Sequence, residues 1–246
     1  MKFKEQIKKM DSIKKTKSQL IEELKVIRKK NIDLETAKIK YNVIQKELDQ
    51  SHKKLSDIME GIAQIITEVI ETRDPHFIGH QRRVSKLATA IAKEMKMTQD
   101  KIEGIKFAAL VYDLGKVNVP TEITNKSSKL AEVEYSRMKN HAKISHDIFK
   151  KVDFPWPIAE IVFQHHERLD GSGYPRGLKG DEILMEAKII AVADVVDAMS
   201  SKRAYRPAYS MKEALEEISK NKGILYEPEA VDTCLKLFKE KSFQFS

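Results

Sequence analysis

Several histidines in this sequence stand where a metal ion could hold them together. The chain has seven histidines, and His80, His141, His165 and His166, with His76 as a fifth, lie near other polar residues in otherwise apolar segments. A lone histidine in such a segment is usually an ordinary core or surface residue. Several at once suggest metal binding, because histidine is the commonest metal ligand in proteins.

Two aspartates in apolar surroundings need partners in the same way. Asp113 directly follows the apolar run at 107–112, and Asp194 interrupts the apolar run at 188–199. Burying an unpaired carboxylate costs several kcal/mol, so each should meet a cation or hydrogen-bond donors. A shared metal centre would satisfy the carboxylates and the imidazoles together, and these ligand types suit Fe, Mn, Zn or Ni.

Helices must position these side chains. Apolar residues at spacings of three and four predict helices at 80–97, 100–112, 131–151, 156–166, 186–200, 211–221 and 228–240. Loops are predicted at Asp74-Pro75, at 119–128 and at the glycine-rich segment 170–180. No alternating strand pattern is present, so the predicted fold class is all-α.

Residues 1–67 predict a long N-terminal coiled-coil helix that precedes a helical domain at 68–246. Apolar residues recur every seven positions, as Ile13, Leu20, Ile27, Leu34, Tyr41, Leu48, Leu55, Ile62 and Val69. This heptad seam favours a parallel homodimer, with polar residues such as Asn31 on the second seam fixing the register. The alternative is a helix whose apolar stripe packs on its own domain, but about eight heptads exceed what one small domain could cover.

Composition narrows the class further. The single cysteine allows no internal disulfide, and neither a signal peptide nor a membrane-spanning apolar run is found, so a cytoplasmic protein is expected. The net charge is +8, but residues 1–60 carry 16 Lys/Arg against 10 Asp/Glu and hold most of the excess. A charged leader helix explains this, and no nucleic-acid partner is predicted.

The spacing of the motifs carries more information than the histidines alone. The sequence contains RDPHFIGHQRRV (73–84), YDLGK (112–116), MKNH (138–141), HHERLDGSGYP (165–175) and VADVVDAMSSKRAYR (192–206). Over roughly residues 68–240 this series resembles the HD-GYP family, a branch of the HD-domain metal-dependent phosphohydrolases. The resemblance implies an HD-domain helical bundle with two metal ions, or three, usually iron or manganese. It also implies hydrolysis of cyclic di-GMP to pGpG or GMP, and a leader helix that joins a sensor or receiver domain.

The resemblance also implies roles for individual residues. The implied metal ligands are His80, Asp113, His141, His165, His166 and Asp194, with Asp113 bridging two metals and His76 as a candidate ligand of a third. Lys116 is implied to contact a phosphate oxygen during catalysis, Arg203 and Arg206 to face the substrate phosphates, and Tyr174 to border the guanine pocket. Two adjacent metals would activate water and stabilise both oxygens of the cleaved bond. Each of these residues also has an ordinary structural explanation. Lys116 could be a cation favoured at a helix C-terminus, Arg203 and Arg206 could be surface charges, and Tyr174 could be part of a turn.

One residue departs from the family pattern at the position that matters most. The family has His-Asp where this sequence has Tyr112-Asp113, so one metal loses an imidazole ligand. A neutral phenol is a poor metal ligand, although a trivalent metal favours phenolate. A smaller departure is Ser127-Ser128, where the family commonly has Pro-Gly.

Two functions therefore stay open at this point. The first is a working cyclic di-GMP phosphodiesterase with a modified metal centre, which the retained lysine, histidines and GYP loop favour. The second is a catalytically degenerate cyclic di-GMP receptor or dimeric signalling module, which Tyr112 favours. A hydrolase of another nucleotide is a third and weaker reading, given the GYP loop.

Overall fold

The computed structural model describes residues 16–73, 78–126, 128–201 and 208–245. Over these ranges the chain is helical and contains no strand, only two isolated β-bridges. The all-α class predicted from the sequence is therefore confirmed. Within the described ranges, no helix is both long enough and apolar enough to cross a membrane.

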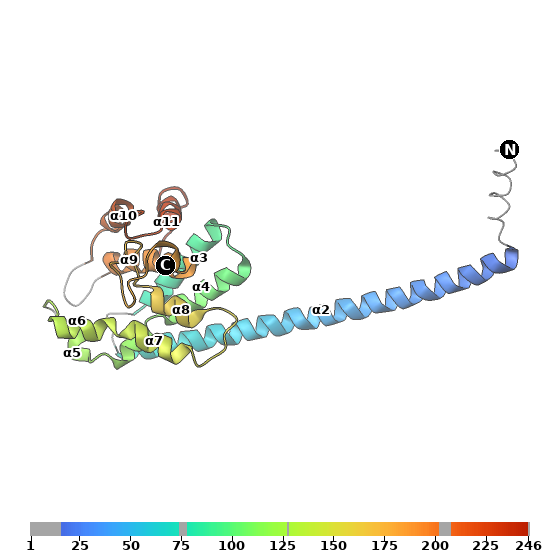
Figure 1. Ribbon diagram of the computed structural model, residues 1–246, viewed down its shortest axis with the longest axis horizontal. Coiled ribbons are helices and arrows are strands. Elements are labelled where there is room, and N and C mark those ends of the chain that lie inside the picture. Colours follow the sequence, from blue (N-terminus) through green and yellow to red (C-terminus); the bar gives the residue numbers. More distant parts are fainter. Residues whose placement is uncertain (1–15, 74–77, 127, 202–207, 246) are drawn as a thin grey trace. The chain divides into compact units, whose positions relative to one another are not determined.

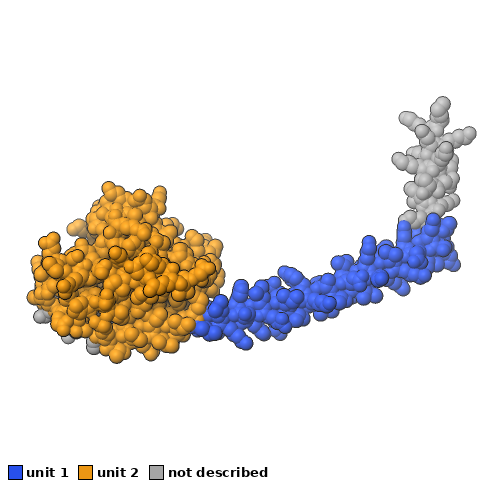
Figure 2. Space-filling model, turned by 60° about the horizontal axis from the view of Figure 1, so that its bottom comes forward, with its two compact units in different colours: residues 1–58 blue, residues 59–246 orange. Residues whose placement is uncertain are grey.

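The chain divides into two compact units, residues 1–58 and 59–246 (Figure 2). The long helix α2, Lys17–Arg73, runs across this boundary. In the first unit it exposes its apolar residues, including Leu34 at 66% and Leu48 at 47%. In the second unit its last turns are partly buried, through Ala63, Thr67 and Ile70.

The second unit is a helical bundle that continues from the end of α2 (Figure 1). Its elements are α3 (His80–Glu94), α4 (Gln99–Val111), η2 (Leu114–Asn118), α5 (Thr121–Thr124), α6 (Glu132–Lys139), α7 (His141–Phe149), α8 (Ile158–Gln164), η3 (Gly180–Glu182), α9 (Met185–Ser200), α10 (Met211–Lys220) and α11 (Pro228–Glu240). Helix α3 packs against both α4 and α9. In α9 nearly every residue from Glu186 to Asp197 is buried, so its two aspartates lie inside the bundle.

The predicted helix at 131–151 is wrong in one respect, because the structure breaks it into α6 and α7 at Asn140. The ring nitrogen Nδ1 of His141 donates to the carbonyl oxygen of Met138 at 2.7 Å. A continuous helix would pair this carbonyl with the N–H of Ala142. The break therefore accompanies the orientation of a candidate ligand. A second difference is the short helix α5, which lies inside the loop predicted at 119–128.

A very close backbone contact holds η2 against α7. The N–H of Gly115 donates to Ser145 Oγ at 2.8 Å, and this hydroxyl donates to the carbonyl oxygen of Tyr112 at 2.9 Å. A Cβ on Gly115 would overlap the His141 carbonyl oxygen and lie 2.9 Å from the backbone nitrogen of Ser145. Only glycine allows this approach, which brings Asp113 next to His141.

We therefore expect Gly115→Ala to lower the free energy of unfolding by at least about 2 kcal/mol, because the backbone must move to accommodate the methyl group. Chemical denaturation of the full chain measures this change. Gly61→Ala is the matched control, since a Cβ at Gly61 meets nothing within 4 Å. That variant should be neutral or more stable by about 0.5–1 kcal/mol, the difference in helix propensity. Equal stability of the two variants would contradict the close packing.

Candidate metal centre

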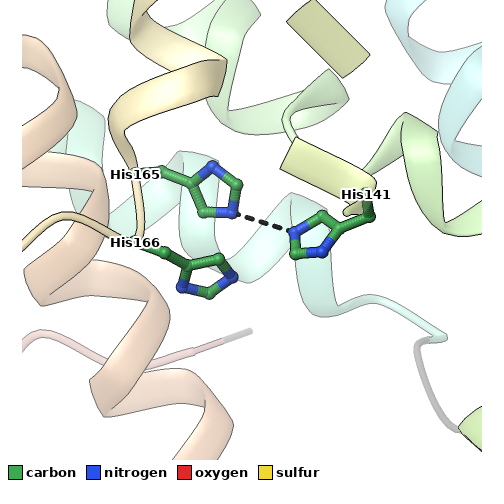
Figure 3. A group of neighbouring side chains, drawn as sticks. All are labelled: His141, His165 and His166. Atoms are coloured by element: carbon green, nitrogen blue, oxygen red, sulfur yellow. Dashed lines mark hydrogen bonds between the residues drawn. The ribbon is translucent and has the colours of Figure 1, made fainter. Parts of the chain in front are cut away.

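Three histidines from two helix ends point toward one another in the bundle (Figure 3). His141 is the first residue of α7, and His165 and His166 directly follow α8. One nitrogen atom from each of the three rings lies within 4.8 Å of the other two, a spacing that could hold a metal ion. His141 and His165 are buried, and His166 is half-buried.

The hydrogen bonds of this cluster fix which ring nitrogens are free to bind a cation. Nδ1 of His141 and Nδ1 of His165 contact the carbonyl oxygens of Met138 and Val162 at 2.7 and 2.6 Å. Both must donate, because a carbonyl only accepts. In a neutral ring this leaves a lone pair on each Nε2, and the two Nε2 atoms face each other at 3.3 Å. Ring orientation by a backbone carbonyl is typical of metal-binding histidines.

A buried carboxylate oxygen completes the same cluster. Oδ1 of Asp113 lies 3.3 Å from Nε2 of His141 and is buried with no hydrogen-bond partner. Facing acceptors without a donor repel one another, whereas a cation among them would satisfy all of them. Three imidazole nitrogens and one carboxylate oxygen are a suitable ligand set for a transition metal. The residues present therefore fit a metal ion at this position.

The electrostatics keep the three imidazoles neutral. Burial lowers the pKa of His141 to about 4, with nearby Lys116 and His165 acting in the same direction. Burial likewise lowers the pKa of His165. The pKa of His166 lies well below its ordinary value, because burial and the neighbouring His165 and His141 all disfavour a proton on its ring. Neutral imidazole is the form that binds metal, so the cluster is ready to bind a cation at neutral pH.

These shifts predict that the metal-free protein loses stability in mild acid. Below the ordinary histidine pKa of about 6.5, the unfolded chain takes up a proton that folded His141 refuses until about pH 4. The free energy of unfolding should therefore fall by about 3 kcal/mol for this group as the pH drops from 6.5 to 4. Chemical denaturation of chelator-treated protein at several pH values in this range measures the free energy of unfolding. If this free energy does not change with pH in the wild type, and its profile matches that of His141→Gln, the burial of a neutral imidazole is contradicted.

A second group of polar residues lies beside the first and is organised differently. The hydroxyl of Tyr112 lies 2.8 Å from Nε2 of His80 and donates to Oδ1 of Asp194 at 2.9 Å. The same two partners are 3.1 Å apart. Tyr112 is completely buried, and its ring makes a T-shaped contact with the ring of His165, with the ring centres 4.7 Å apart. Tyr112 thus stands between the two groups.

Asp197 orients His80 from behind, a role that the sequence did not reveal. Its carboxylate accepts from Nδ1 of His80 at 2.6 Å and from Nε of Arg83 at 2.6 Å. Burial alone would raise the pKa of Asp197, but the hydrogen bonds from His80 and Arg83 hold it below its usual value. The available signal was its position three residues after Asp194, on the same side of an apolar helix.

Lys116 pairs with Oδ2 of Asp113, the carboxylate oxygen that is not the one next to His141. Its Nζ donates to Oδ2 of Asp113 at 2.8 Å, and its side chain is 16% exposed. Burial would raise the pKa of Asp113, but the charges of Lys116, His141 and His165 hold it below its usual value. Burial would also raise the pKa of Asp194, but the hydrogen bond and the charge of His80 hold it well below its usual value.

The GYP loop folds back onto the paired histidines through Glu167. This buried carboxylate accepts from the backbone N–H of Arg176 at 2.7 Å and of Leu178 at 3.0 Å. The N–H of Tyr174 donates to the carbonyl oxygen of His166 at 3.2 Å, and the two rings lie 4.6 Å apart. The HHE and GYP motifs therefore form one structural unit, in which Glu167 fixes the loop beside the cluster.

The structure brings most of the predicted site residues into one region. These are His80, Asp113, Lys116, His141, His165, His166, Tyr174 and Asp194. The other three predicted residues, His76, Arg203 and Arg206, lie outside the described residues, as does Ser127. Their roles as a third-metal ligand, phosphate contacts and loop residue stay predictions.

The fold and the cluster together define the class, an all-helical domain with a set of candidate metal ligands at helix ends. The family model described as "HD domain" matches residues 64–230, and the chain belongs to this family. The family predicted from the motifs is thereby confirmed. That Tyr112 stands in place of the first residue of the His-Asp pair stays a prediction.

Curated relatives resemble the chain over most of its length. A "Cyclic di-GMP phosphodiesterase" of Thermotoga maritima is 38% identical over 213 residues, which are 86% of this chain and 58% of that protein. A "3′3′-cGAMP-specific phosphodiesterase 3" of Vibrio cholerae is 34% identical over 181 residues, which are 73% of this chain and 39% of that protein. The chain thus spans about half the length of these relatives.

A solved structure supports the fold independently. A cyclic GMP-AMP specific phosphodiesterase of Vibrio cholerae superposes with a TM-score of 0.58 and 18% identity, covering 76% of this chain and 49% of that one. At this identity the likeness establishes the fold alone.

Proposed function

We propose that the protein is a metal-dependent phosphodiesterase that hydrolyses cyclic di-GMP to pGpG or GMP. The observation that carries this proposal is the ligand cluster of His141, His165, His166 and Asp113, which has Lys116 beside it. The name of the Thermotoga maritima relative supports the substrate. Iron or manganese is the proposed metal. Of the two ions that the sequence predicts, or three with His76, this cluster would hold at least one.

The metal, when bound, would supply a Lewis acid and lower the pKa of a bound water. The chain's own residues position and balance the charges around it. Asp113 Oδ1 faces the cluster, while its Oδ2 holds the Lys116 ammonium close by. This ammonium can exchange its carboxylate contact for an oxygen of the scissile phosphate, whose negative charge grows as the bond breaks.

A basic pocket next to the cluster suits the rest of a cyclic dinucleotide. Its volume is about 380 Å³, and it is lined by Ser136, Arg137, Lys139, Asn140, Lys143, Tyr174 and Pro175. The Nζ of Lys139 lies 4.7 Å from the centre of the Tyr135 ring and 5.5 Å from that of Tyr174. A purine base can stack on such a tyrosine, and the cations can hold a phosphate. The loop that Glu167 holds lines the pocket through Tyr174 and Pro175, and Tyr174 also contacts His166 of the cluster.

A receptor function is the second candidate, because Tyr112 hydrogen-bonds to two residues that the sequence predicts as metal ligands. Titration calorimetry and product analysis on one metal-loaded sample separate the two functions. Turnover to pGpG or GMP identifies the enzyme. Binding of cyclic di-GMP without turnover identifies the receptor, and neither binding nor turnover rejects both.

We also propose that two copies associate in parallel through α2. Its heptad residues are exposed in the first unit, among them Leu20, Ile27, Leu34, Leu48 and Leu55. Such a continuous apolar seam is buried when a second copy pairs with it. A sensor or receiver domain ahead of this helix would fit the same proposal, with a cytoplasmic location.

Replacing Leu34 and Leu48 with lysine should convert the dimer to a monomer, because two like charges would then face their copies across the seam. Analytical ultracentrifugation of the full chain measures the change in mass. The control replaces Thr36 and Gln50 with lysine, two exposed residues that lie two positions further along the helix, away from the seam. A dimer that survives the leucine replacements would place the interface elsewhere.

A further inference from the structure

The two groups of polar residues differ in whether they are satisfied without a metal. Around His141 and His165, lone pairs and the Oδ1 oxygen of Asp113 face one another with no donor between them. Around His80 and Asp194, the Tyr112 hydroxyl supplies a hydrogen-bonding group to both residues. A cation therefore relieves an electrostatic conflict in the first group only.

In the second group, Nε2 of His80 either carries a proton or uses its lone pair to accept a hydrogen bond from Tyr112. A phenol has one proton to donate. If it donates to Asp194, the 2.8 Å contact with Nε2 requires that Nε2 carries a proton and donates to the phenol. If it donates to Nε2 instead, that lone pair is engaged. In both arrangements the Tyr112 hydroxyl occupies the coordinating face of His80.

Asp113 is also poorly placed to bridge two metals. Its Oδ2 atom accepts from Lys116 at 2.8 Å and lies 3.9 Å from Nε2 of His80. A carboxylate oxygen neutralised by an ammonium has less to offer a second cation, and the two cations would repel each other. Only Oδ1 faces a ligand set that needs a cation.

We infer that the described residues hold a single metal ion, bound by His141, His165, His166 and Asp113, and that Tyr112 excludes a metal from His80 and Asp194. This number is smaller than the two or three ions expected from the sequence, and the inference rests on the proposed function only for the presence of a metal. The hydroxyl of Tyr112 takes the place of the excluded ion by joining His80 to Asp194.

Metal counting on the full chain tests the inference without any assay of turnover. The protein is loaded anaerobically with Fe(II) or Mn(II) alone, and bound metal is measured by elemental analysis. About one ion per chain is expected for the wild type and about two for Tyr112→His, whose shorter imidazole restores a ligand. Two ions in the wild type would overturn the inference.

His80→Ala provides the matched comparison in both backgrounds. In the wild-type chain it should leave the metal content unchanged, and in the Tyr112→His chain it should lower the content from about two ions to about one. If Tyr112→His does not fold, the wild-type background still decides, since a loss of metal on replacing His80 would contradict the inference.

Optical spectroscopy separates exclusion from direct ligation by the phenol. The iron-loaded protein, once oxidised, should show no charge-transfer band from phenolate to Fe(III). Such a band, lost in Tyr112→Phe, would show that Tyr112 is a ligand and overturn the inference. A chain with one ion and no turnover would leave the inference intact and reject the proposed activity, so the two failures are distinguishable.

Discussion

Asp113→Ala is expected to lower the bound metal to less than about a tenth of the wild-type content and turnover of cyclic di-GMP by at least about 1000-fold. The physical reason is that Oδ1 of Asp113 is the only carboxylate oxygen that the described residues place among the three histidines without a hydrogen bond. Without it, the ligands are three neutral imidazoles, and the bound cation loses the charge that neutralises it.

Two further variants make this result specific. Asp113→Asn keeps the volume of the side chain but removes the charge, so it should lose metal nearly as completely as the alanine variant. Asp153→Ala, at an exposed aspartate, should keep both metal and turnover. An Asp113→Ala protein that folds, keeps its metal and turns over substrate would remove Asp113 from the centre.

Lys116→Met should lower turnover by about 100- to 1000-fold while the metal content stays the same or rises. Methionine preserves the length of the apolar stem but removes the ammonium that is held 2.8 Å from Asp113. The loss of a nearby positive charge favours a bound cation, whereas the developing charge on the phosphate loses its partner. Elemental analysis and steady-state kinetics on the same sample measure the two effects separately.

A fall in turnover without a fall in metal content would show that Lys116 acts on the phosphate and does not only stabilise the fold. If Lys116 only stabilised the fold around Asp113, metal and turnover would fall together. Lys151→Met, at an exposed lysine, should change neither. An unchanged rate in Lys116→Met would show that the ammonium does not act on the phosphate.

The sequence predicted the helices of the domain well, because their apolar faces repeat with the helical period. It placed α4, α9, α10 and α11 to within about one or two residues at each end. It missed the break at Asn140, since the period of apolar residues continues through 131–151 and the break arises with the hydrogen bond of His141 to Met138. Tertiary contacts of this kind leave no periodic signal.

The candidate site was predicted as a set of residues but not as an arrangement. The motifs identified the histidines and aspartates, yet they could not show that Tyr112 contacts both His80 and Asp194. The roles of Asp197 behind His80 and of Glu167 under the GYP loop also follow only from contacts. Gly115 was part of the YDLGK motif, but its need for close packing against His141 is visible only in three dimensions.

The most direct test of the central claim measures cyclic di-GMP hydrolysis and metal content on one anaerobic preparation of the full chain. We predict that iron- or manganese-loaded protein forms pGpG or GMP, that chelation abolishes both metal and product formation, and that adding the metal back restores them in proportion. Fully metal-loaded protein that binds cyclic di-GMP but forms no product would contradict the phosphodiesterase account and establish the receptor instead.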